Sequence, residues 1–128
     1  MENRFKFRWF SKVRLKMFDV VCIEYPGTII YKDENGHEIE TSWSSDNGVL
    51  MQCTGLKDKF GKPIFEGDIV SFKIGANPTI ALVEYDTENA EWRKGHFASL
   101  GSYKKNTQII GNVFENLELL TVKNEKQV

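Results

Sequence analysis

Three carboxylates lie close together in the middle of this 128-residue chain: Asp58, Glu66 and Asp68. Clustered carboxylates can ligate a divalent cation or act as a general acid and base pair. They can equally cap turns, because an Asp side chain accepts hydrogen bonds from nearby backbone N–H groups. Gly61 and Gly67 stand at turn positions beside these acids, which favours turn capping. We therefore expect structural carboxylates here, and a metal-dependent enzyme is the third hypothesis for function.

The histidines and cysteines add no catalytic or metal-binding set. His37 follows an Asn-Gly turn and is expected to be an exposed loop residue, whereas His96 is expected to be a structural histidine in a strand. Cys22 and Cys53 lie in apolar stretches and are expected to be buried thiols. The four residues lack the close spacing of zinc ligands, and no nucleotide-binding or nucleophile-elbow motif occurs. The sequence thus predicts a protein that is not an enzyme, with no catalytic residue, cofactor or metal.

A basic segment at the N-terminus could bind nucleic acid. Six basic residues alternate with apolar ones within the first sixteen positions, where Glu2 is the only acidic residue. They are Arg4, Lys6, Arg8, Lys12, Arg14 and Lys16. Basic side chains interleaved with aromatic ones can hold phosphates and stack on bases. The alternatives are a solvated edge whose charges discourage aggregation, and a contact with an acidic surface of another subunit.

The basic residues of this segment are expected to lie on strands. Their alternation with apolar residues, with a period of two, predicts a hairpin with strands at 4–9 and 12–17. Further strands are expected at 19–25, 28–31, 39–43, 69–74, 79–85, about 91–98 and 107–114. Gly111 inside the last strand predicts a bulge or a close backbone approach.

Turn signals recur every ~8–12 residues, which predicts a mainly β fold with little helix. We expect one domain over residues 1–128, built as a small SH3-like antiparallel barrel with an appended N-terminal hairpin. Residues 1–25 are expected to form the hairpin region, 49–120 the β core and 121–128 a frayed tail.

The charge and apolar content limit the partners. A net charge of −1 gives no global attraction to nucleic acid or to an anionic membrane. No apolar run reaches the ~20 residues of a membrane span, and the N-terminus does not read as a signal peptide. We therefore expect a cytoplasmic protein with no membrane partner.

The segment 54–70, T-G-L-K-D-K-F-G-K-P-I-F-E-G-D-I-V, resembles the signature of the YopX family of small phage and prophage proteins. The segment 110–120 resembles a second block of that family. The matching positions are Gly55, Leu56, Asp58, Gly61, Ile64, Glu66, Gly67, Asp68, Gly111, Asn112, Glu115 and Asn116. The chain departs from the family pattern at Cys53, where an aromatic residue is usual, and at Leu117, where Pro is usual.

The resemblance implies a phage- or prophage-encoded accessory protein of the bacterial host cytoplasm, in a family with no established activity. We expect it to act through protein–protein contacts as a homo-oligomer, or with a phage or host protein. The alternative is a nucleic-acid-binding module that uses the basic N-terminal hairpin.

Overall fold

The computed structural model describes residues 6–44, 46–95, 98–102 and 106–120. Strands account for 60% of the described residues and helix for 4%, which confirms a mainly β fold with little helix. The chain divides into two compact units, and the boundary lies between Cys53 and Thr54, inside strand β5 (Gly48–Lys57). We call them the N-terminal and C-terminal units. The expected single domain over residues 1–128 stays a prediction.

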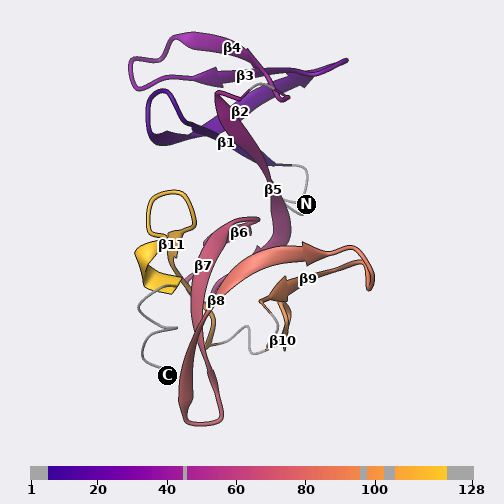
Figure 1. The fold of residues 1–128 in the computed structure, drawn as a ribbon, viewed down its shortest axis with the longest axis vertical. Coiled ribbons are helices and arrows are strands. Elements are labelled where there is room, and N and C mark those ends of the chain that lie inside the picture. Colours follow the sequence, from indigo (N-terminus) through magenta and orange to yellow (C-terminus); the bar gives the residue numbers. More distant parts are fainter. Residues whose placement is uncertain (1–5, 45, 96–97, 103–105, 121–128) are drawn as a thin grey trace. The chain divides into compact units, whose positions relative to one another are not determined.

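The N-terminal unit is an antiparallel sheet in the order β4-β3-β2-β1-β5 (Figure 1). Its strands are β1 (Phe7–Ser11), β2 (Lys16–Glu24), β3 (Thr28–Lys32), β4 (Glu38–Ser42) and the first half of β5. The core under this sheet consists of Trp9, Phe18, Ile29 and Tyr31. Gly48 is required beside it, because a Cβ atom there would overlap the indole ring of Trp9.

The N-terminal hairpin is confirmed, but its strands lie elsewhere than expected. Residues 12–15 form the turn between β1 and β2, so the expected strand at 12–17 is wrong, and the expected strand at 19–25 is part of β2. Leu15 adopts a φ of 56°, a left-handed conformation in which side chains no longer alternate between the two faces of a strand. The first residues of the expected strand at 4–9 lie outside the described part of the chain.

The C-terminal unit holds a five-stranded antiparallel sheet in the order β10-β9-β8-β7-β11. The strands are β7 (Asp68–Ile74), β8 (Asn77–Asp86), β9 (Glu91–Lys94), β10 (Ala98–Ser99) and β11 (Gln108–Asn112). The short strand β6 (Pro63–Phe65) lies beside β5, and β7 and β8 make a long hairpin (Figure 1). Val70, Phe72 and Val83 pack in the core with Ile64 and Leu100.

The strands of the described residues form two antiparallel sheets and no closed barrel. Closure needs the two edge strands of a sheet to pair with each other. Here β10, which is only two residues long, pairs with β9, and β11 pairs with β7 at the other edge. No helix among the described residues has the length and apolar character that a membrane crossing needs.

Candidate functional site

Asp58 caps the first turn of the central signature. Its side chain is 7% exposed, and its Oδ1 accepts hydrogen bonds from the N–H groups of Phe60 and Lys62, each at 2.9 Å. Its Oδ2 accepts a third, at 3.2 Å, from the N–H of Ile109 in β11. Gly61 completes the turn with a φ of 81°. The carboxylate therefore holds backbone, as turn capping predicts.

Asp68 plays the same part in the second turn. It is 1% exposed, and its Oδ2 accepts a hydrogen bond of 2.8 Å from the N–H of Phe65. Gly67 between them has a φ of 87°, and Glu66 is half-buried. Within the described ranges, no group of three or more His, Cys, Asp or Glu side chains is arranged to hold a metal ion. The turn-capping prediction is thus confirmed for Asp58 and Asp68.

The other residues of the central signature also shape the backbone. Gly55 has a φ of 84°, and Ile64 is buried in the core of the C-terminal unit. The hydroxyl of Thr54 donates a hydrogen bond of 2.8 Å to the carbonyl of Ile64, which ties β5 to β6. Leu56, by contrast, is partly exposed.

The second family-like block builds a closed loop after β11. Gly111 lies at a shift of register between β11 and β7, which confirms the predicted bulge. The N–H of Asn112 donates to Oδ1 of Asn116 at 3.1 Å, and the N–H of Asn116 donates back to the carbonyl of Asn112 at 2.8 Å. Asn112 also donates through Nδ2 to Glu115 at 2.7 Å. A Cβ atom at Gly111 would lie 2.5 Å from Oδ1 of Asn116, so only glycine fits there.

Among the candidate basic residues that the structure describes, two have carboxylate partners, so these residues do not form one uncompensated patch. Lys6 is exposed just before β1, Arg8 is half-buried within β1, and Lys12 is exposed in the hairpin turn. Arg4 lies outside the described residues.

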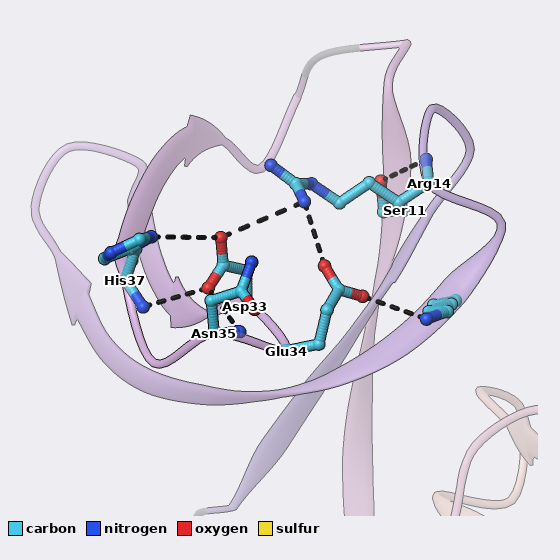
Figure 2. Close-up of polar contacts among 7 residues, drawn as sticks. Ser11, Arg14, Asp33, Glu34, Asn35 and His37 are labelled. Atoms are coloured by element: carbon cyan, nitrogen blue, oxygen red, sulfur yellow. Dashed lines mark hydrogen bonds and ion pairs between the residues drawn. The ribbon is translucent and has the colours of Figure 1, made fainter.

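Arg14 instead faces the acidic turn between β3 and β4 (Figure 2), and Lys16 pairs with Glu34 of the same turn. Nη1 of Arg14 lies 3.0 Å from Oε1 of Glu34 and 4.0 Å from Oδ2 of Asp33. Nζ of Lys16 lies 3.0 Å from the other oxygen of Glu34. The residues of this network are Ser11, Arg14, Lys16, Asp33, Glu34, Asn35 and His37.

Electrostatics keep these two acids ionised. The backbone N–H of His37 donates to Asp33 at 2.9 Å and is the largest cause that lowers the pKa of Asp33. The hydrogen bond from the Lys16 ammonium is the largest cause that lowers the pKa of Glu34. Two of the six basic groups thus have carboxylate partners within the same unit.

Several large apolar side chains of the N-terminal unit are exposed. Their exposed fractions are Tyr25 97%, Val13 74%, Leu15 70%, Val21 54% and Trp43 47%. Val13 and Leu15 lie in the turn between β1 and β2, which we call the hairpin tip (residues 12–15). Their exposure was not expected, because the alternating pattern predicts a strand with a buried apolar face for this segment.

A cleft of about 500 Å³ lies where β4 ends beside the turn between β2 and β3. It is lined by Pro26, Gly27, Thr28, Glu40, Thr41, Ser42, Trp43 and Ser44, and we call it the Trp43 cleft. The N–H of Trp43 donates to the carbonyl of Gly27 at 3.0 Å. The indole lies so close over Gly27 that a Cβ atom there would be 3.0 Å from its Nε1.

Lys94 is a buried cation that the sequence did not signal. It is fully buried in β9, and its Nζ donates to the carbonyl of Ser102 and, at 2.8 Å, to the hydroxyl of Thr107. The same nitrogen lies 4.3 Å from the ring centroid of Phe72. Burial lowers the pKa of Lys94 to about 8. These contacts tie β9 to the segment that leads into β11.

The expectations are confirmed for one cysteine and one histidine and are wrong for the other cysteine. Cys53 is buried as expected, but Cys22 is exposed, because a bulge in β2 between Val20 and Cys22 shifts the alternation of sides. His37 is exposed as expected. His96 lies outside the described residues.

Comparisons with known proteins identify a family and similar solved structures. The family model described as YopX protein matches residues 6–121. The chain is also similar to the crystal structure of protein EF1440 from Enterococcus faecalis, with a TM-score of 0.62 and 28% sequence identity. That similarity covers 90% of this chain and 96% of the other. No curated protein matches the chain.

Proposed function

Because the chain belongs to the YopX family, as its sequence signature predicts, we propose that it acts through protein–protein contacts as a homo-oligomer. The observation that carries the proposal is the set of large apolar side chains exposed on the N-terminal unit. Burial of one such side chain is worth about 1.5–3 kcal/mol. Val13 and Leu15 are exposed together in the hairpin tip, and neighbouring exposed apolar side chains favour a surface that another chain covers.

The proposed role is not catalytic. Asp58 and Asp68, which could have formed a cluster for chemistry, accept hydrogen bonds from backbone N–H groups instead. Oxygens of both carboxylates are therefore engaged with backbone within their own unit. The family membership further supports an accessory protein of a phage or prophage, working in the cytoplasm of the bacterial host. Phage genes beside this one on the chromosome would support that origin.

The homo-oligomer is tested by size-exclusion chromatography with light scattering at tens of micromolar protein. We expect a mass that is a multiple of the 14.8 kDa chain. A strict monomer across the accessible concentration range would overturn the proposal.

Nucleic-acid binding through the basic hairpin is the second candidate, favoured by the exposure of Lys6 and Lys12. It has weaker support because Glu34 faces both Arg14 and Lys16. Gel-shift titrations with single- and double-stranded DNA and RNA, at low and moderate salt, separate the candidates. If nucleic acid is the partner, Glu34→Gln tightens binding and charge reversal at Arg14 abolishes it.

A further inference from the structure

The hairpin tip and the Trp43 cleft lie at opposite ends of one strand. The tip precedes β2 (Lys16–Glu24), and the turn that borders the cleft follows it. A nine-residue strand is about 30 Å long at ~3.3 Å per residue. Arg14 and Glu34 confirm which end is which, since the β3–β4 turn lies beside the tip (Figure 2). The tip therefore cannot reach the cleft of its own unit.

The tip carries two unfavourable features at one residue. Leu15 has a φ of 56°, which costs a bulky residue about 1–2 kcal/mol, and its side chain is exposed. Val13 beside it is exposed as well, and Lys12 adds a positive charge. The turn is well ordered, because Ser11 accepts the N–H of Arg14 with its hydroxyl and the N–H of Leu15 with its carbonyl. Backbone strain is found at functional sites, and an exposed apolar tip is stabilised when another surface covers it.

The Trp43 cleft has the complementary chemistry. Trp43 supplies an aromatic face, and the fully exposed Tyr25 stands next to the cleft-lining Pro26. Aromatic faces take both apolar side chains and cations. Glu40 in the lining adds a negative charge. The cleft, of about 500 Å³, is open to solvent, so a side chain of another copy can enter it.

We propose that the hairpin tip of one copy docks into the Trp43 cleft of a second copy. Val13 and Leu15 cover the aromatic surface, and Lys12 approaches Glu40. This inference rests on the proposed homo-oligomer and names its contact. If two copies exchange tips, each tip in the other's cleft, the result is a two-fold dimer; if each tip enters the cleft of a further copy, rings or filaments form.

Two variants block one side of the contact each. Leu15→Asp blocks the tip, and the hairpin is retained because Asp tolerates a positive φ. Trp43→Ala empties the cleft while the backbone hydrogen bond to Gly27 stays. We expect at least about tenfold weaker self-association in each variant by light scattering. Phe60→Asp, at an exposed apolar residue of the C-terminal unit, is the matched control and should assemble like the wild type.

Mixing the two blocked variants is the decisive step. Each retains one intact surface, so an equimolar mixture should form a heterodimer that grows no further. If both variants are monomeric but the mixture stays monomeric too, the contact is not tip to cleft. If both variants keep the wild-type mass, the docking is overturned while the homo-oligomer stands. A monomeric wild type would overturn both proposals.

A charge exchange tests the same contact if a blocked variant does not fold. Lys12→Glu and Glu40→Lys change exposed side chains, and each should weaken assembly by putting like charges together. The double variant Lys12→Glu with Glu40→Lys should restore it. Loss without restoration in folded protein would contradict the proposed pairing, and circular dichroism establishes folding for every variant.

Discussion

Asp58 shows how a single buried carboxylate organises distant backbone. One oxygen holds its own turn, and the other reaches Ile109, 51 residues along the chain. The positively charged Lys94 also connects distant segments, because its ammonium group links β9 to Ser102 and Thr107. Both groups are ionisable, and both are held by hydrogen bonds within the C-terminal unit.

Removal of the Asp58 carboxylate should destabilise the C-terminal unit. Asp58→Ala leaves the N–H groups of Phe60, Lys62 and Ile109 without this acceptor, and we expect a loss of about 1.5–3 kcal/mol in the free energy of unfolding. Asp58→Asn should lose less, because one amide oxygen can still cap the turn. Urea denaturation measures both, with the exposed Asp46→Ala as control. An alanine variant as stable as the control would refute the capping role.

The titration of Lys94 should make stability rise at alkaline pH. Its pKa of about 8 in the folded protein lies below the ordinary value of 10.5. Between these values the unfolded state binds more protons, so the free energy of unfolding increases with pH, by up to about 2–3 kcal/mol.

Urea denaturation at a series of pH values from about 7 to about 10 tests this. The rise should vanish in Lys94→Met, whose side chain does not titrate, and should persist in the control Lys73→Met, at an exposed lysine of β7. An equal slope in wild type and Lys94→Met would show that other groups cause it.

At the scale of elements, tight turns and a bulge determine where strands begin and end. The hairpin tip sets the start of β2, and the loop that follows Gly111 ends β11. Each depends on one residue with a special backbone or steric requirement. The two positions differ in strain. Gly111 leaves room for Asn116, which a Cβ atom would not, whereas Leu15 has a positive φ that is unfavourable for a bulky residue.

Gly111→Ala should therefore be strongly destabilising. The new Cβ atom would push against Asn116 and break the paired hydrogen bonds with Asn112, at a cost of about 1–3 kcal/mol. Gly101→Ala is the matched control, since a Cβ atom there meets nothing within 4 Å. Thermal denaturation of the two variants compares them directly. Equal melting temperatures would mean that the loop adjusts without loss.

Leu15→Gly should have the opposite effect on stability. It relieves the strain of the positive φ, and after the entropy cost of glycine we expect a gain of about 0.5–1 kcal/mol for the N-terminal unit. The same change should weaken self-association if the tip is a contact. Denaturation below the assembly concentration and light scattering above it measure the two effects. A less stable Leu15→Gly protein would show that the Leu15 side chain supports its own unit.

At the scale of the whole molecule, self-association should appear as a dependence of stability on concentration. Binding between folded copies stabilises them by mass action, so the apparent melting temperature of the wild type should rise with protein concentration. Leu15→Asp should lack this dependence, and Phe60→Asp should keep it. Differential scanning fluorimetry over a hundredfold range of concentration would check it. A constant melting temperature for the wild type would argue against assembly.

Local chemistry alone determined much of this protein. The turns at Asp58–Gly61 and Glu66–Asp68 and the bulge at Gly111 follow from residue types a few positions apart. Hydrogen bonds from a side chain to its own turn, and the freedom of glycine, are encoded within such short segments. The family membership rests on the same residues, which is why it could be inferred without a structure.

Only the tertiary structure decided the rest. The pairing of Arg14 with Glu34, the burial of Lys94 and the exposure of Cys22 each depend on segments far apart in the chain or on a bulge that alternation does not reveal. The same is true of the expected barrel, since closure depends on which edge strands meet. The left-handed Leu15 turned a predicted strand into an exposed tip, because one φ angle changes which residues face the core.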